Sequence, residues 1–263
     1  MPSAAYGASL AATCFVAAGL ALQVAAAQPL TGRDVVPTPQ ILVDSMLDLA
    51  GVTADDIVVD LGSGDGRMVI AAAKRGATAK GIEYNPGMVA LAKANAASEG
   101  VSDRATFEHA DIFASDFSNA DVVTLFLLPE MYDRLRPILL KLKPGTRVVS
   151  NTFGMGAWRP DRVATVAEEC DYYFCKALLW IVPARVDGKW TIESGELSLD
   201  QTFQTFIGTL GNGEAVFPID DGLIKGETIT FIAGGIVYAG KINGTAIEGT
   251  NSACGKWLAK RGT

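Results

Sequence analysis

Apolar residues follow two different patterns along the chain, and the change falls near residue 186. Before it, short continuous apolar runs such as IVVDL at 57–61 alternate with stretches whose apolar residues recur at helical spacing. Continuous apolar runs are typical of parallel strands buried on both faces, and their alternation with helices is typical of doubly wound sheets. The first part of the chain therefore predicts an α/β fold.

Capping and turn residues set the ends of these predicted elements. Thr38 precedes an amphipathic stretch at 38–50 that Gly51 follows, so we expect Thr38 to cap a helix with Pro39 in its first position. Asn85 is expected to cap a later helix in the same way. The predicted helices cover 38–50, 66–76, 85–100 and 130–143. The predicted strands form a doubly wound, mostly parallel, seven-stranded Rossmann-like sheet and cover 57–61, 78–84, 105–111, 121–129, 145–153 and an antiparallel pair at 162–169 and 171–184.

Helical spacing disappears from residue 187 onward. Short β-like stretches alternate there with Gly-Asn, Asp-Gly, Gly-Gly and Asn-Gly pairs, which favour hairpin turns. We expect a small all-β antiparallel domain at 187–263, either a meander or a partly closed barrel, after an α/β domain at 28–186. Its aromatic side chains are expected to fill its own core: Trp190, Phe203, Phe206, Phe217, Phe231, Tyr238 and Trp257.

The segment 1–27 differs from the rest in composition. It has no charged side chain, contains an apolar run at 8–27, and ends in three alanines that suit signal cleavage. As a helix, 8–27 would be about 30 Å long, so an uncleaved membrane anchor is an alternative to a cleaved signal peptide, and an unstructured tail is a third. We expect either an exported, periplasmic protein or a membrane-associated one whose folded part faces the cytoplasm.

Composition excludes several kinds of site and partner. The 263 residues carry a net charge of −7 with no block of lysine and arginine, which argues against nucleic-acid binding. His109 is the only histidine, so a site with several histidine ligands is excluded and no metal is expected. After residue 27 the cysteines are Cys170, Cys175 and Cys254, without C-x-x-C spacing. We expect them to be buried as small apolar residues or, in an exported protein, to form one disulfide that involves Cys254.

A glycine-rich turn follows the first predicted strand. Its pattern, D-x-G-x-G-x-G, runs from Asp60 to Gly66, and Arg67 stands where a dinucleotide fingerprint would have its third glycine. Asp60 and Asp65 would put negative charge where a pyrophosphate binds. The turn therefore favours a cationic ligand without phosphate, and S-adenosylmethionine, with its sulfonium and ammonium groups, is such a ligand.

Acidic residues also follow the next two predicted strands. Glu83 stands 21 residues after Gly62, where a carboxylate would hold ribose hydroxyls. Asp111 could accept a hydrogen bond from an adenine amino group, and Ile112 would frame the ring. Each residue alone also suits an ordinary turn or strand end, but the three successive strand ends together predict a methyl-donor site. The methyl acceptor is then expected near 125–129.

The stretch VDLGSGDGRMVIAAAKRGATAKGIEYNP at 59–86 is similar to the class I S-adenosylmethionine-dependent methyltransferases. With ADIF at 110–113 and W-x-P-D at 158–161, the chain most closely resembles the lysine N-methyltransferases that include those for the ATP synthase c-subunit and the adenine nucleotide translocase. This resemblance implies methyl transfer from S-adenosylmethionine to a lysine of a protein, in particular a membrane protein. The predicted cofactor-binding residues are Asp60, Gly62, Ser63, Gly64, Asp65, Gly66, Glu83, Asp111 and Ile112.

The acceptor side is predicted around the end of the fourth strand. The resemblance places Pro129 and Trp158 near an acceptor channel, and Glu130 or Tyr132 would orient the amine, so these four are the predicted catalytic residues. An apolar slot would lower the pKa of the acceptor lysine by desolvation. The slot is predicted from Leu127, Leu128, Phe153 and Trp158. The resemblance implies that 36–39 forms a lid over the acceptor channel. Ordinary core packing is the alternative for Phe153 and Trp158, and a favourable charge at a helix start is the alternative for Glu130.

Two other functions remain open on the sequence. A methyltransferase for a lipid, a quinone or another small molecule would share the donor residues and differ only in its acceptor pocket. An exported binding protein with a relict methyltransferase domain is the other alternative, because S-adenosylmethionine is made in the cytoplasm. The resemblance does not extend to the all-β domain, which would do the binding in that case.

Overall fold

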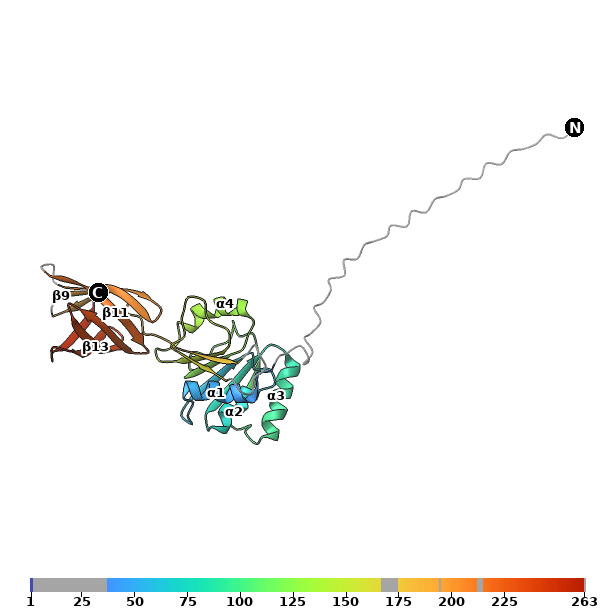
Figure 1. Ribbon diagram of the computed structural model, residues 1–263. Coiled ribbons are helices and arrows are strands. Elements are labelled where there is room, and N and C mark those ends of the chain that lie inside the picture. Colours follow the sequence, from blue (N-terminus) through green and yellow to red (C-terminus); the bar gives the residue numbers. More distant parts are fainter. Residues whose placement is uncertain (2–36, 167–174, 194, 212–214, 263) are drawn as a thin grey trace.

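The computed structural model describes Met1 and residues 37–166, 175–193, 195–211 and 215–262, which form a sheet unit and a barrel (Figure 1). The helices are α1 (Gln40–Ala50), α2 (Arg67–Lys74), α3 (Pro86–Ser98) and α4 (Pro129–Leu139). The strands of the sheet are β1 (Ile57–Leu61), β2 (Thr78–Glu83), β3 (Ala105–His109), β4 (Val122–Leu125), β5 (Arg147–Asn151), β6 (Arg162–Thr165) and β7 (Lys176–Ile181). The predicted segment 1–27 lies, apart from Met1, outside the described residues.

The seven-stranded sheet has the order β3-β2-β1-β4-β5-β7-β6. The first five of these strands pair in parallel, whereas β7 runs antiparallel to both β5 and β6. Helices α1, α2 and α3 cover one face and α4 covers the other (Figure 1). Side chains of β1 alternate between the two faces, because Val58 packs with α1–α3 and Val59 packs in the cluster around α4. The predicted fold class is confirmed.

Helix ends agree with the predictions at two caps and differ at a third. Asn85 caps α3 with its side chain, and Gly51 ends α1 in the left-handed conformation. Helix α1, however, begins at Gln40 with Pro39 as its N-cap, so the prediction that Thr38 caps this helix is wrong. Thr38 is instead buried, and its carbonyl accepts a hydrogen bond from Nη1 of Arg67 at 2.8 Å.

The C-terminal strands close into an eight-stranded antiparallel barrel rather than a meander or a partly closed one (Figure 1). They are β8 (Gly188–Ile192), β9 (Gly195–Thr202), β10 (Thr205–Gly211), β11 (Val216–Lys225), β12 (Thr228–Ala233), β13 (Ile236–Asn243), β14 (Ala246–Asn251) and β15 (Lys256–Arg261). The barrel closes because β8 bonds to both β9 and β15. A tight turn at Phe203 and Gln204 separates β9 from β10.

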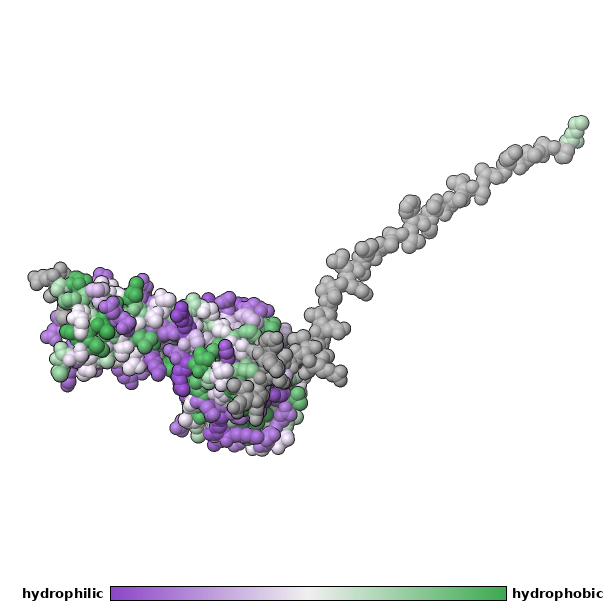
Figure 2. Space-filling model, viewed as in Figure 1, coloured by the Kyte–Doolittle hydropathy of each residue, from purple (hydrophilic) through white to green (hydrophobic). Residues whose placement is uncertain are grey.

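Five of the seven predicted core aromatics are buried inside the barrel: Trp190, Phe206, Phe231, Tyr238 and Trp257. The prediction is wrong for Phe217, which is 45% exposed and lies against the turn at Gly234. It is also wrong for Phe203, which packs against the sheet unit. Other apolar side chains of the barrel, such as Ile207 and Val237, are also exposed. Figure 2 shows apolar spots scattered over the surface of the barrel. Scattered exposed apolar residues of this kind are normal.

Two cysteines, Cys175 and Cys254, lie within the described residues. Cys254 is exposed and free, so the expected burial of Cys254 and the expected disulfide through it are both wrong, whereas Cys175 is disulfide-bonded. Cys170 lies outside the described residues. No helix in the described part of the chain is long and apolar enough to cross a membrane.

Candidate active site

The glycine-rich turn lies at the carboxyl end of β1 and leads into α2. Gly62, Gly64 and Gly66 all have positive φ, which glycine adopts readily and other residues rarely adopt. A Cβ on Gly66 would lie 2.8 Å from the ring of Phe107, and one on Gly62 would lie 2.6 Å from Leu127. The spacing of the glycines therefore reflects both backbone conformation and close packing.

Glu83 fixes this turn to the start of α3. One carboxylate oxygen accepts from the backbone N–H of Gly64 at 2.9 Å, and the other accepts from that of Asn85 at 2.8 Å. The amide of Asn95 adds a bond to the carbonyl of Asp65 at 2.9 Å. Glu83 thus stands beside the turn, as predicted, but its observed bonds are structural and its contact with a ribose stays a prediction.

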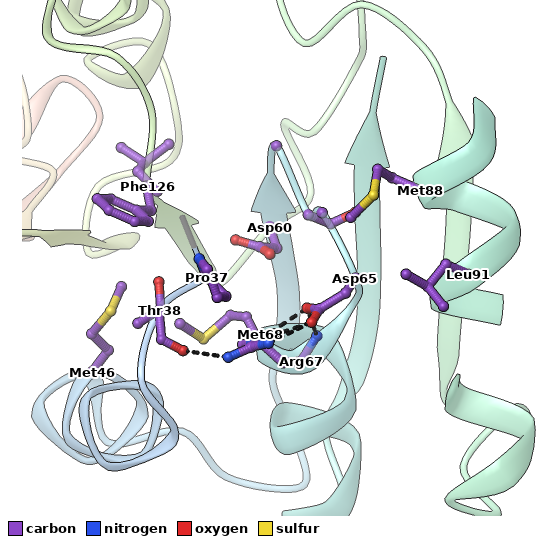
Figure 3. Close-up of a pocket in the computed structure, with 14 residues that line it drawn as sticks. Pro37, Thr38, Met46, Asp60, Asp65, Arg67, Met68, Met88, Leu91 and Phe126 are labelled. Atoms are coloured by element: carbon purple, nitrogen blue, oxygen red, sulfur yellow. Dashed lines mark hydrogen bonds and ion pairs between the residues drawn. The ribbon is translucent and has the colours of Figure 1, made fainter. Parts of the chain in front are cut away.

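A cavity of about 260 Å³ opens above the turn (Figure 3). In this view Phe126 lies on one side of Asp60, and Met88 and Leu91 from α3 lie on the other. Five of the predicted cofactor residues line the cavity: Asp60, Gly62, Ser63, Gly64 and Asp65. The other lining residues are Pro37, Thr38, Met46, Arg67, Met68, Met88, Leu91, Leu125 and Phe126.

Asp60 is a buried carboxylate in the wall of this cavity. Burial raises its pKa to about 7, while a hydrogen bond from Thr124 lowers it, and the charges of Glu83 and Asp65 raise it further. Thr124 stands opposite Asp60 on β4 and donates at 2.6 Å. A cationic ligand in the cavity would favour the ionised form of Asp60.

Asp65 is held by Arg67, a residue that sequence reasoning did not assign to the site. Burial acts to raise the pKa of Asp65, but hydrogen bonds and the charge of Arg67 outweigh it and lower the pKa. The two side chains form an ion pair at 2.5 Å, and Arg67 also bonds to the carbonyl of Thr38 (Figure 3). Because Arg67 compensates Asp65, Asp60 is the cavity's uncompensated acid among the described residues. The signal in the sequence was an arginine two positions after an aspartate in the same turn.

The remaining predicted cofactor residues do not line the cavity. Gly66 lies beneath it as the N-cap of α2. Asp111 is exposed and accepts a hydrogen bond from the backbone of Phe113 at 2.9 Å, and Ile112 beside it is buried. Both follow β3 as predicted, and their contact with an adenine stays a prediction.

Aromatic side chains form the wall opposite the donor turn. Phe126 lines the cavity and stacks on Phe153 with ring centroids 6.3 Å apart, and Phe153 meets Tyr132 edge-on at 6.2 Å. Phe126 lies within 125–129, where the sequence predicted the acceptor, but it was not among the residues named for the slot. The predicted Leu127, Tyr132 and Phe153 do not line the cavity themselves, and Phe153 joins the wall only through its stacking on Phe126.

The hydroxyl of Tyr132 connects the loop that follows β4 to the end of β5 by hydrogen bonds. The backbone N–H of Leu127 donates to its hydroxyl at 3.4 Å, and the hydroxyl lies 2.8 Å from Oγ of Ser150. Ser150 in turn donates to the carbonyl of Phe153 at 2.8 Å, which leaves Tyr132 as the donor to Ser150. Burial raises the pKa of Tyr132, so its hydroxyl stays protonated at neutral pH. Tyr132 therefore sets the spacing of the wall.

The other predicted catalytic residues lie away from the cavity lining. Pro129 and Glu130 are exposed at the start of α4, next to Leu128, which is 63% exposed. Trp158 is completely buried, and neither it nor Glu130 lines the cavity. The described residues contain no group of three or more acidic, cysteine or histidine side chains that could hold a metal ion.

The sheet order, the glycine turn and the acids at the strand ends define a class I S-adenosylmethionine-dependent methyltransferase. The ANTKMT methyltransferase domain family matches residues 60–162. A protein-lysine N-methyltransferase of Saccharolobus islandicus is 46% identical over 136 residues, which cover 51% of this chain and 84% of that protein. Within the class, this chain belongs to that protein-lysine N-methyltransferase family, so the resemblance stated above is confirmed.

Two further similar proteins show how much of the chain the similarity covers. The human lysine N-methyltransferase for the ATP synthase c-subunit is 42% identical over 107 residues, which cover 40% of this chain and 46% of that protein. The chain thus spans less than half of the human relative. The crystal structure of an RNA methyltransferase from Salinibacter ruber with S-adenosyl-L-homocysteine is 48% identical, with a TM-score of 0.53, and covers 57% of this chain and 96% of that one. The barrel lies outside the family match at 60–162.

Proposed function

We propose that this methyltransferase modifies the ε-amine of a protein lysine, with a membrane protein as the expected acceptor. The observation that carries the proposal is one cavity with two unlike walls, Asp60 and the glycine turn on one side and Phe126 stacked on Phe153 on the other. A carboxylate suits a cationic methyl donor, and an apolar aromatic wall suits a neutral amine. The lysine N-methyltransferases among the relatives support the same acceptor.

The donor side fits S-adenosylmethionine, which when bound supplies the methyl group. Asp60 provides the negative charge, and the positive-φ glycines let the backbone come close to a ligand. We assign Gly62, Ser63, Gly64 and Asp65 to the same contact, since they line the cavity, and Glu83, Asp111 and Ile112 to the ribose and the adenine.

The acceptor side has to favour an unprotonated amine. Lysine in water has a pKa near 10.4, so at pH 7 only roughly one amine in 2,500 is neutral, a cost of about 4–5 kcal/mol. Phe126, backed by the ring of Phe153, presents an apolar surface to the cavity and lowers this cost by desolvating the ammonium. Tyr132 and Ser150 already donate within the protein, so the proton leaves to solvent. Alignment of the amine with the methyl group then supplies most of the acceleration.

We assign the exposed predicted residues to the mouth of the acceptor side. Glu130 carries a negative charge at the start of α4 and would attract a lysine ammonium before it loses its proton. Pro129 begins the same helix and sets its direction. Trp158, which is fully buried, would act only by supporting the wall.

Methyl-labelled S-adenosylmethionine tests the proposal. The full chain is incubated with membrane and soluble fractions of the source cell, and label is counted separately in protein, RNA and organic extract. We expect label in a discrete protein band that is lost with Asp60→Asn and retained with Asp103→Asn, a matched change at an exposed acid. Label that appears only in the organic extract would show that the methyl acceptor is a small molecule or lipid and not a protein lysine.

RNA is a second candidate acceptor because of the Salinibacter ruber structure, which is that of an RNA methyltransferase. The net charge of −7 and the lack of a lysine/arginine block disfavour it here, since RNA binding needs cations against the phosphates. Label confined to the RNA fraction would establish this alternative.

We further propose that residues 8–27 attach the protein to a membrane or direct its export. Their uncharged, apolar composition supports either outcome. The intact mass of the native protein separates the two, because loss of 1–27 favours a cleaved signal peptide, whereas a chain of full mass in the membrane fraction favours an anchor. A chain of full mass in the soluble fraction would contradict both.

A further inference from the structure

The turn between β9 and β10 points out of the barrel and into the sheet unit. Phe203 at its tip has a φ of 55°, a conformation that is a genuine outlier for a bulky side chain. Its ring stacks on Trp158, with centroids 6.1 Å apart and planes 16° apart, and packs with the cluster around α4. Backbone strain of this kind persists only where the surroundings demand it.

The next residue, Gln204, adds a polar contact to the same segment. Its side chain is buried and donates to the carbonyl of Arg159 at 2.8 Å. Its own carbonyl accepts from the backbone of Ile224 at 2.7 Å, which anchors the turn to β11. Two neighbouring residues of the barrel therefore hold the W-x-P-D segment at 158–161.

The connection between the two units is also fixed. The side chain of Gln201 accepts from the backbone N–H of Val186 at 2.7 Å and donates to the carbonyls of Ala184 and Phe203 at 3.0 and 2.7 Å. The backbone of Ala184 bonds to Gly226 of the barrel at 2.8 Å. These bonds hold the turn in place relative to the sheet.

Trp158 links this contact to the acceptor wall. It belongs to one buried cluster with Met155 and Tyr132, against which Phe153 packs. The carbonyl of Met155 accepts from the backbone of Trp158 at 3.3 Å and from Arg136 of α4 at 2.9 Å. One hydrophobic cluster therefore contains Trp158, on which Phe203 stacks, and has Phe153, which stacks on Phe126, packed against it.

We propose that Phe203 and Gln204 are positioning residues for methyl transfer, through which the barrel holds the 155–161 segment and the aromatic acceptor wall in place. This role rests on the proposed function, because the wall is assigned to the acceptor. It gives the barrel, which lies outside the family match, a direct part in the reaction. Neither residue touches the donor cavity, so donor binding should not depend on them.

The test compares full-length Phe203→Ala and Gln204→Ala with Phe217→Ala, which removes an exposed phenylalanine from the same barrel. Initial rates are measured at rising amounts of whichever cell fraction the wild type labels, and S-adenosylmethionine affinity is measured by calorimetry. We expect Phe203→Ala to lower the maximal rate by about 10-fold with unchanged donor affinity. Phe203→Tyr, which keeps the stacked ring, should restore the rate, and Phe217→Ala should match the wild type.

Hydrogen–deuterium exchange gives a readout that needs no acceptor. Phe203→Ala should speed exchange of backbone amides at 153–161 and leave those of β1 and α2 unchanged. Unchanged exchange at 153–161, or equal rates for Phe203→Ala and Phe217→Ala, would overturn the positioning role. If the wild type labels no fraction, the proposed function fails, and exchange at 153–161 decides separately whether the barrel holds this segment.

Discussion

Replacement of Asp60 by asparagine should strengthen the fold and weaken donor binding at once. Burial raises the pKa of Asp60 to about 7 from an ordinary 3.8. Each pH unit between these values corresponds to about 1.4 kcal/mol, so ionised Asp60 costs the empty folded protein about 4 kcal/mol at pH 8. Asparagine keeps an oxygen that can accept from Thr124 and removes the charge.

The sign of the pH dependence follows from the raised pKa. The folded protein holds the Asp60 proton more tightly than the unfolded chain, so stability from this group is greatest at low pH and falls as pH rises from about 4 to about 7. Thermal unfolding of the ligand-free protein should show this fall in the wild type, and Asp60→Asn should reduce it. At pH 8 the variant should therefore melt at a higher temperature than the wild type.

Donor affinity should change in the opposite direction. With a pKa of about 7, Asp60 is mostly protonated at pH 6 and mostly ionised at pH 8, so affinity for a cationic donor should rise between them, by roughly 10-fold. Calorimetry with Asp60→Asn at the same two pH values gives the pH dependence of affinity without Asp60, which includes titration of the ligand's own amine. If the variant binds S-adenosylmethionine as tightly as the wild type, or shows the same pH dependence, Asp60 is not the donor's counter-charge.

Three further changes test other parts of the site. Tyr132→Phe removes a buried hydroxyl between two loops, so it should cost about 1–2 kcal/mol of stability and raise the half-saturating acceptor concentration without changing donor affinity. Ser150→Ala should cost a similar amount, and the two losses should not add in the double variant if the residues share one bond. Full additivity would contradict the shared bond. Gly66→Ala places a Cβ 2.8 Å from Phe107 and should cost about 3 kcal/mol in denaturant unfolding, whereas Gly100→Ala, which meets no atom within 4 Å, should cost clearly less. Arg67→Gln removes the partner that lowers the pKa of Asp65, so the wild type should be more stable than the variant at neutral pH, and this difference should shrink as pH falls below about 4. The bond from Arg67 to the carbonyl of Thr38 does not titrate, so part of the difference should remain. A difference that is as large at pH 2 as at pH 7 would contradict the role of the Asp65 ion pair.

The parts of the fold that local chemistry determines were predictable from the sequence. Asn85 and Gly51 end helices because their side chain and backbone freedom suit those positions in any context. The glycine turn and Asp60 were predictable for the same reason. The turn at Phe203 was not, because its residues lack the glycine, asparagine or proline that favours a turn. Contacts with distant residues stabilise it instead, among them the stacking of Phe203 on Trp158 and the bond from Gln204 to Arg159.

Site residues that depend on long-range contacts were the ones missed. Local sequence favours Thr38 as a helix cap, but its partners Arg67 and Asn151 lie 29 and 113 residues away and bring it into the cavity wall. Arg67 stands out in the sequence only as a departure from a glycine pattern. Phe126 belongs to the wall because β4 and β5 are neighbours and bring it beside Phe153. Such pairings follow from the sheet order, which no local pattern specifies.

Identification of the labelled residue tests the central proposal most directly. The protein band labelled by the full chain and methyl-labelled S-adenosylmethionine is digested, and the modified peptide is sequenced by mass spectrometry. The proposed function predicts added methyl groups on a lysine side chain, present with the wild type and with Asp103→Asn and absent with Asp60→Asn. Methyl groups on another residue type, or label found only in RNA or in the organic extract, would contradict lysine as the acceptor.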